Sequence, residues 1–269
     1  MEQLIVVLAV ITAGAAAVRS TWSPCGLSML STVTPMAESG RGRRWGVTAT
    51  WFVLGAVLGG LTTGAVVAVV ALGLEAAALS ATTTVALAAV AALVAVGIDL
   101  VPATSRLAIP HHRRQVNEDW LVQFRAWVYG SGFGWQIGTG LATYIMTAAV
   151  YLTFVLAALT ASPPVALALA AWFGLARGLA ILAGARSTST DRLLVLHRRL
   201  DRWAEPVRRA VIAVEVGVAA VAVTAAAGPV AGLAVAGAVG GAAVLVTSRR
   251  AAAATSTPVP AGAAEVVAA

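Results

Sequence analysis

Long apolar runs are the feature that most constrains this chain: runs of 18 residues or more recur along most of its 269 residues. A run of this length forms a helix long enough to cross the hydrocarbon core of a bilayer. The composition agrees, because 59% of the residues are hydrophobic and only 11% are charged, whereas soluble domains carry about 25% charged residues. The sequence therefore predicts an all-α polytopic membrane protein and argues against a water-soluble enzyme.

The apolar runs divide into seven predicted spans within a transmembrane domain of residues 1–250. The spans cover about 4–36, 45–73, 78–101, 127–160, 163–185, 209–227 and 229–247. The dipeptide Gly228-Pro229 marks the last joint, and the alternative is one long kinked helix over 209–247. The first run has the length of a signal peptide but no positive charge before it, so we expect a retained span.

The arginines predict the topology. Of the 18 basic residues, all of which are arginine, 16 lie in the loops 37–44, 102–126 and 186–209 or at the start of the C-terminal tail. Seven spans place all four segments on one side. The positive-inside rule then predicts an outside N-terminus and a cytoplasmic C-terminus in a bacterial plasma (inner) membrane. The net charge of +7 is thus a topology signal and not a sign of nucleic-acid binding, and residues 251–269 are expected to be a disordered cytoplasmic tail.

Residues 190–209 show a helical pattern of their own. Apolar residues recur there at steps of three and four, with arginines mostly on the other faces. This pattern predicts an amphipathic helix on the inner leaflet, with its arginines toward anionic lipid headgroups. The alternative is a solvated helix in a loop between two spans.

The first and fourth spans are too long for straight helices. Residues 4–36 would extend over roughly 50 Å at about 1.5 Å per residue, yet the hydrocarbon core is only about 30 Å thick. Pro24 lacks a backbone N–H and disfavours helix at Ser23, which predicts a break there. Broken backbone at membrane depth is tolerated inside protein or against a water-filled cavity.

The fourth span contains a segment that aligns with this break. Placing Trp22 over Trp135 sets Gln136 opposite Ser23. If the fourth helix begins at Asn117, Trp135 lies 18 residues after its start, as Trp22 does after Leu4. Spans one to three and four to six would then be two inverted three-helix repeats, with the seventh helix added. Interrupted helices at matching places in two halves indicate the central site of a transporter.

The segment Ser-Pro-Cys-Gly-Leu at 23–27 resembles the first-helix motif of the transmembrane domain shared by the cytochrome c biogenesis protein CcdA and the thiol reductant exporter DsbD. Residues 134–138 stand where that family carries a Gly-Trp-Thr-Pro-Cys-type segment in its fourth helix. The resemblance covers roughly residues 4–227. It implies a fold of two inverted three-helix units, which LysE-type amino-acid exporters and sulfite exporters share.

The resemblance also implies a thiol-redox activity, in which family members cycle a pair of cysteines. Cys25 matches the first cysteine, but Gly138 stands at the position of the second. Thiol–disulfide exchange needs a resolving thiol, and Cys25 is the only cysteine in the chain, so a redox role would require a partner thiol protein. The alternative is that Cys25 is a small buried hydrophobic residue.

Charged residues inside the spans are further candidates, since such residues are costly in a membrane and commonly functional. Arg177 and Glu215 have matching depths and are predicted to form an ion pair. Arg19 lies close to the first break, where it could meet an anionic substrate or extend toward water. Asp99 is either a proton-linked acid or an interfacial residue facing Arg106.

Glycines at four-residue steps predict close contact between helices. They occur at Gly130, Gly134 and Gly138 in the fourth span and at Gly55 and Gly59 in the second. Helix packing is therefore the favoured explanation for the glycine at position 138, and the alternative is the loss of a redox cysteine.

These features favour a transporter-like membrane protein that moves a small solute through a site at the two helix breaks. The alternatives are a thiol-redox component using Cys25 and a non-transporting scaffold with arginine-rich loops. The candidate central-site residues are Arg19, Trp22, Ser23, Pro24, Cys25, Trp135, Gln136 and Gly138. No hydrolase, phosphate-loop or metal-site motif is present, so we expect no enzymatic activity, no cofactor and no metal.

Overall fold

The computed structural model describes residues 2–101 and 123–256. The regular secondary structure within these residues is entirely helical. The helices are α1 (Glu2–Arg19), η1 (Ser20–Trp22), α2 (Pro24–Thr32), α3 (Pro35–Gly40), α4 (Trp45–Ala76), α5 (Ala81–Leu100), α7 (Ala126–Gly138), α8 (Ala149–Leu159), α9 (Pro163–Leu179), η2 (Ala180–Gly184), α10 (Thr190–Ala227) and α11 (Pro229–Ser256). Six stretches are long and apolar enough to cross a membrane: α1 with η1, α4, α5, α9 with η2, α10 and the first 18 residues of α11. The prediction of an all-α polytopic membrane protein is confirmed.

Most predicted spans match the observed helices closely. α4, α5 and the α9–η2 segment begin and end within a few residues of the predicted second, third and fifth spans. The two over-long spans are both interrupted, the first at Ser23 and the fourth over residues 139–148.

Gly228, with a φ of +91°, separates α10 from α11, so the predicted joint between the last two spans is confirmed. Helix α11 continues to Ser256, which extends helix into the predicted disordered tail, and residues 257–269 lie outside the described part.

The amphipathic segment 190–209 is not a separate helix. It forms the first half of α10, a single helix of 38 residues that would be roughly 57 Å long at about 1.5 Å per residue. The Trp22 indole N–H donates to the Leu200 carbonyl at 2.8 Å, and Ser31 Oγ lies 3.0 Å from His197 Nε2. One face of the segment therefore packs on η1 and α2, which corrects the expectation of a helix lying flat on lipid.

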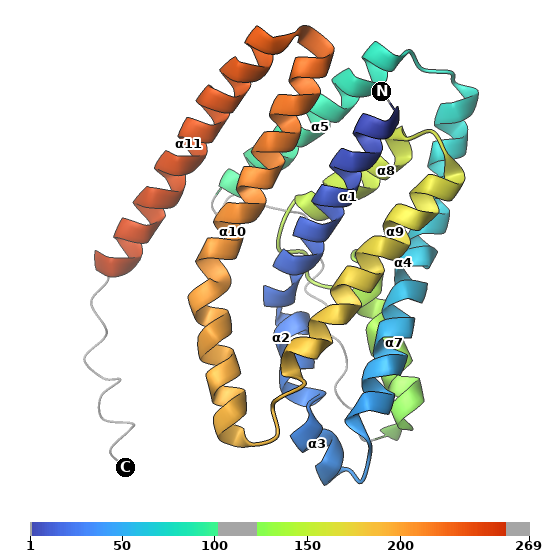
Figure 1. Ribbon diagram of the computed structural model, residues 1–269, viewed down its shortest axis with the longest axis vertical. Coiled ribbons are helices and arrows are strands. Elements are labelled where there is room, and N and C mark those ends of the chain that lie inside the picture. The colour runs from blue at the N-terminus through green and yellow to red at the C-terminus, as the bar shows by residue number, and fades with distance from the viewer. Residues whose placement is uncertain (1, 102–122, 257–269) are drawn as a thin grey trace.

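The helices pack in a reciprocal pattern (Figure 1). α4 packs against α9, and α5 packs against α10. In the predicted halves, α1, α4 and α5 are the first three spans, and α7 with α8, α9 and α10 are the next three. α1, the first helix of one half, contacts α9, the second helix of the other, and α7 contacts α4 in the same way. Two inverted three-helix units would produce this arrangement, with α11 packed on α10 as the added helix.

Glycines allow α4 and α7 to approach closely. A Cβ atom at Gly134 or Gly138 would overlap the α4 backbone at the carbonyls of Phe52 and Ala56, respectively. Gly59 lies equally close to the backbone of α7 around Trp135. The predicted role of these glycines in helix packing is confirmed, and this packing fixes α7 against α4.

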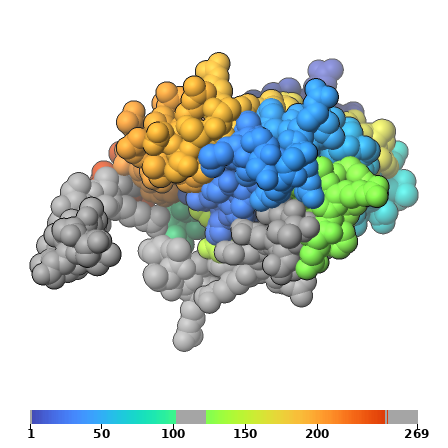
Figure 2. All heavy atoms as spheres, turned by 90° about the horizontal axis from the view of Figure 1, so that it is seen from below, coloured from blue at the N-terminus to red at the C-terminus, as the bar shows by residue number. Residues whose placement is uncertain are grey.

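The arginine-rich connections lie at one end of the bundle. α3 lies beside the loop before α10, where the Met36 N–H donates to the Ser187 carbonyl at 3.2 Å, and the turn that carries Arg41, Arg43 and Arg44 follows α3 directly. Figure 2 views the molecule from this end and shows the first part of α10 next to the α3–α4 region. We call this the arginine-rich end. The predicted loop 102–126 falls largely outside the described residues, including Arg106.

Candidate functional site: buried charges between the interrupted helices

The first helix is broken by local sequence. After the 3-10 turn of η1, Ser23 adopts an extended conformation and its side chain accepts a hydrogen bond from the Gly26 N–H at 3.1 Å. Pro24 occupies the first turn of α2, where its missing N–H is not needed. A Cβ at Gly26 would overlap the carbonyl of Thr21, so the turn requires glycine there. The predicted break at Ser23 is confirmed.

The second break lies just beyond the predicted motif. α7 ends at Gly138, and Gly140 has a φ of +72°, a conformation that favours glycine. Trp135 is 41% exposed and its indole N–H donates to Thr62 Oγ1 on α4 at 3.0 Å. Trp135 thus faces the outside of the bundle, and Gly138 faces α4, so neither lines a space between the two breaks. Gln136 is half-buried in the last turn of the same helix.

Three charged side chains, two of them buried, gather where the interrupted helices meet. They are the buried Arg19 at the end of α1, the buried Glu215 in α10 and the half-buried Asp99 at the end of α5. Asp99 Oδ1 accepts a hydrogen bond from the Ala148 N–H at 2.7 Å, and Oδ2 accepts one from the Thr147 hydroxyl. The carboxylate therefore caps the start of α8, where the positive end of the helix dipole favours a negative charge.

Glu215 has the least satisfied environment in the cluster. Its side chain is fully buried, and neither carboxylate oxygen has a hydrogen-bond partner among the described residues. It faces the N–H of Ala149 without completing a hydrogen bond, and its charge interacts with that of Asp99. Burying an unpaired carboxylate lowers the free energy of unfolding. The stability of the fold therefore gives no reason for a glutamate at this position.

Arg19 is the cationic member of this cluster. Its side chain is 8% exposed, and its Nη1 has no partner within residues 2–101 and 123–256. Its charge interacts with Asp99 on one side and with Arg208 and Glu205 on the other. Glu205 itself pairs with Arg208 at 2.8 Å and with Arg209 at 2.9 Å. Charged groups thus extend from the polar half of α10 to the buried centre.

The predicted ion pair between Arg177 and Glu215 is wrong. The Arg177 guanidinium lies 5.7 Å from the centre of the Phe173 ring on its own helix and lines a small cavity with Ser20 and Thr21. Glu215 instead faces α8. The two residues have matching positions along their helices, but depth does not determine the direction in which each side chain points.

Cys25 is closed off beside this small cavity. It is 1% exposed and packs in an apolar cluster with Met29, Leu30 and Phe52, although it lies near enough to Arg177 for an electrostatic interaction. The adjoining cavity has a volume of about 10 Å³, close to the minimum that holds one water molecule. The region around the first break is therefore closed.

Sequence reasoning missed a second buried carboxylate, Glu38. It is fully buried in α3 and accepts hydrogen bonds from the Thr48 hydroxyl at 2.5 Å, from Arg41 Nη1 at 3.0 Å and from the Tyr129 hydroxyl. These contacts join α3 to α4 and α7 near the arginine-rich end. The sequence signal was the spacing of Glu38 three residues before Arg41, which suits a pair on one helical turn.

The fold and the buried charges define a multi-pass, all-helical integral membrane protein. None of the described His, Cys, Asp and Glu residues forms a group of three that could hold a metal ion.

The chain is similar to proteins named methylamine utilization protein MauF. It is 33% identical over 176 residues to the protein of Paracoccus versutus, covering 64% of this chain and 62% of the relative. It is 33% identical over 181 residues to that of Paracoccus denitrificans (64% and 63%), and 29% identical over 185 residues to that of Methylophilus methylotrophus (67% and 63%). The chain thus spans a little under two thirds of the length of these relatives. No protein-family model and no solved structure matches it.

Proposed function

We propose that this chain is a transporter-like, non-enzymatic membrane protein that moves a small solute through a site formed by Arg19, Asp99 and Glu215. The observation that carries the proposal is Glu215, which is fully buried without a hydrogen-bond partner among the described residues. A carboxylate in this position commonly belongs to a substrate or proton pathway.

The location of the cluster supports the same proposal. α1 ends at Arg19, and Asp99 caps α8 directly after the second break. Interrupted helices expose backbone groups and helix ends in the middle of a transporter, where solutes and coupling ions bind. Since the cavity beside the first break holds about 10 Å³, the conformation described is a closed one, and transport would require the two halves to separate.

The proposal also assigns the arginine-rich end to one side of the membrane and the protein to a metabolic process. The positive-inside rule favours a cytoplasmic location for the arginine-rich end, in a plasma (inner) membrane. The names of the relatives refer to methylamine utilization, and we extend this process to the present chain as an accessory membrane role.

Complementation tests both parts. The chain is expressed in a Paracoccus denitrificans strain that lacks its own MauF, and growth on methylamine is measured. We expect the wild-type chain to restore growth, and Arg19→Gln and Asp99→Asn to abolish it at equal membrane abundance. Glu75→Gln, an exposed carboxylate at the far end of α4, serves as the control and should restore growth fully. Failure of the wild-type chain would contradict the process, and full growth with both site variants would contradict the site and favour a scaffold role.

A thiol-redox role is the second candidate, and the position of Cys25 favours it. The residue lies in the first turn of α2, directly after the break, and close to the charge of Arg177. In this role its thiolate would attack a disulfide of a partner protein, forming a mixed disulfide and releasing one partner thiolate, and a second protein with two thiols would then reduce the mixed disulfide, free Cys25 and become a disulfide itself. This matches the resemblance of residues 23–27 to CcdA and DsbD.

The packing of Gly138 weighs against an internal relay, because a side chain there would overlap the Ala56 carbonyl. Two measurements separate the candidates. Transport at the charged cluster predicts that Cys25→Ser restores growth, and that a permeant maleimide labels Cys25 in intact membranes only after denaturation. The redox role predicts loss of growth with Cys25→Ser.

A further inference from the structure

A second polar feature, separate from the buried charges, lies at the arginine-rich end. A pocket of about 620 Å³ lies between η2 with its following loop and the first turns of α10. Its lining includes Arg186, Arg192 and Arg199 together with the apolar side chains Leu182, Val195 and Leu196. We call it the arginine pocket.

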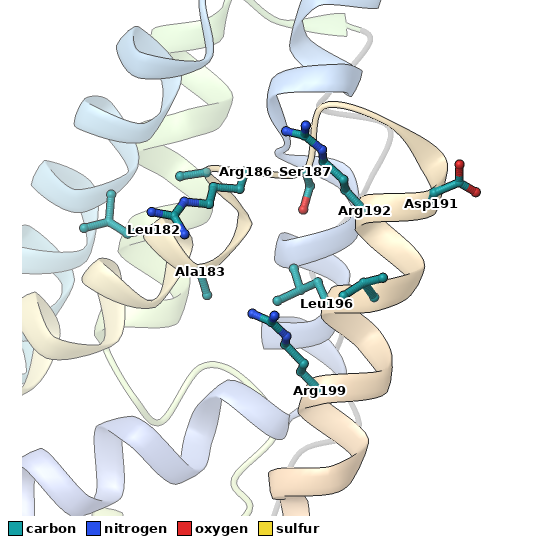
Figure 3. A pocket seen from close by; sticks show the side chains of 10 residues that line it. Leu182, Ala183, Arg186, Ser187, Asp191, Arg192, Leu196 and Arg199 are labelled. Atoms are coloured by element: carbon teal, nitrogen blue, oxygen red, sulfur yellow. The ribbon is translucent and has the colours of Figure 1, made fainter.

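The spacing along α10 explains why these residues share one face. Arg192 and Arg199 are seven residues apart, with Val195 and Leu196 between them, so all four follow the same side of the helix. Figure 3 shows the side chains of Arg192 and Arg199 extending from α10 toward η2, while Arg186 lies beside Leu182.

The positive charge in the pocket is uncompensated within the described part of the chain. The ion pairs found there involve Arg41, Arg208 and Arg209 and none of the three pocket arginines. Asp191 is the one acidic residue in the lining, and its carboxylate points away from the arginines (Figure 3). Three like charges around one hollow repel one another unless an anion binds between them.

The apolar part of the lining is open as well. Leu182 is 51% exposed and Val195 is 40% exposed, and Leu182 belongs to the last turn of the α9–η2 span. The pocket therefore offers arginines and exposed apolar surface side by side at the end of a membrane-crossing segment. An amphiphile with an anionic head and an apolar body matches both surfaces.

We propose that the arginine pocket binds a phosphate group, and that the source is the headgroup of an anionic phospholipid with its acyl chains against Leu182 and Val195. The planar guanidinium groups of arginine bind phosphate oxygens in pairs. Inorganic phosphate offers the same oxygens without the apolar body. This proposal does not depend on the proposed transport function, because it concerns a different site.

Native mass spectrometry of the detergent-purified 269-residue chain tests the proposal. Dioleoyl phosphatidylglycerol and dioleoyl phosphatidylcholine are added at equal concentrations, and inorganic phosphate is titrated calorimetrically in a second arm. We expect preferential retention of phosphatidylglycerol, reduced roughly 30-fold in R192Q/R199Q, since each surface arginine contributes about fivefold to the affinity for anionic lipid. The matched control is R198Q/R202Q, which removes the same charge from exposed positions of the same helix outside the pocket.

The two arms identify the source of the phosphate. Lipid binding that is lost only in R192Q/R199Q supports a lipid headgroup. Inorganic phosphate binding with the same dependence, and no preference between the lipids, supports the phosphate site with a soluble source. Equal losses in both double variants, or no binding in either arm, would overturn the proposal.

Discussion

The carboxylate of Asp99 accepts a hydrogen bond from the backbone N–H of Ala148 at 2.7 Å, and thereby joins the end of α5 to the start of α8. The first helix break is made by neighbouring residues, Ser23 and Pro24. The second is held from another helix, 49 residues away in sequence. Asp99 therefore has a structural role in addition to its proposed place in the charged cluster.

Replacing Asp99 with alanine is expected to destabilise the protein. The change leaves the Ala148 N–H and the Thr147 hydroxyl without their acceptor, and an unsatisfied buried donor costs about 1–3 kcal/mol. Thermal unfolding in detergent should show a lower midpoint for Asp99→Ala and a smaller decrease for Asp99→Asn, which keeps one acceptor oxygen. Asp201→Ala, at an exposed position of α10, is the control, and an equal effect of Asp99→Ala and Asp201→Ala would refute the capping role.

The Glu38 network is expected to hold α3 and α7 onto α4. Glu38→Ala removes the shared acceptor of Thr48 and Tyr129 and should lower the free energy of unfolding by about 2–4 kcal/mol, since two buried donors lose their partner. Tyr129→Phe removes one donor and should cost about 1 kcal/mol. Chemical unfolding followed by tryptophan fluorescence measures both. If Glu38→Ala proved as mild as Tyr129→Phe, Glu38 would not be the centre of the network.

Gly138 is expected to be a packing residue. Gly138→Ala places a methyl group into the Ala56 carbonyl and should destabilise the protein by about 1–3 kcal/mol or more, because the α4 backbone must shift. Gly14 is the matched control, because nothing lies within 4 Å of its Cβ position. Gly14→Ala should be neutral or stabilise by about 0.5–1 kcal/mol, as expected for glycine to alanine inside a helix. Similar midpoints for the two variants in thermal unfolding would contradict this assignment.

The sequence predicts the features of this fold that depend on local residues. Apolar length locates the spans, Pro24 locates the first break, and glycine spacing identifies the face of α7 that meets α4. Each signal acts within one helix, or over a few residues, so no knowledge of distant neighbours is needed.

Relationships between distant helices were harder to predict. Arg177 and Glu215 match in depth but face different neighbours, because the rotation of each helix depends on packing. Asp99 accepts hydrogen bonds from Thr147 and Ala148. The spacing of residues along the sequence does not predict this contact. The polar segment 190–209 looks like a separate helix, yet it continues into α10 and packs on η1 and α2.

The most direct test of the charged cluster as a solute site is Glu215→Gln, measured for stability and for function in the same preparation. The amide has nearly the same shape but no charge, so replacing a buried, unpartnered carboxylate should leave the thermal midpoint unchanged or raise it. Growth on methylamine in the complementation strain should nevertheless be lost. A Glu215→Gln protein that folds normally and restores growth to the wild-type level would contradict the account.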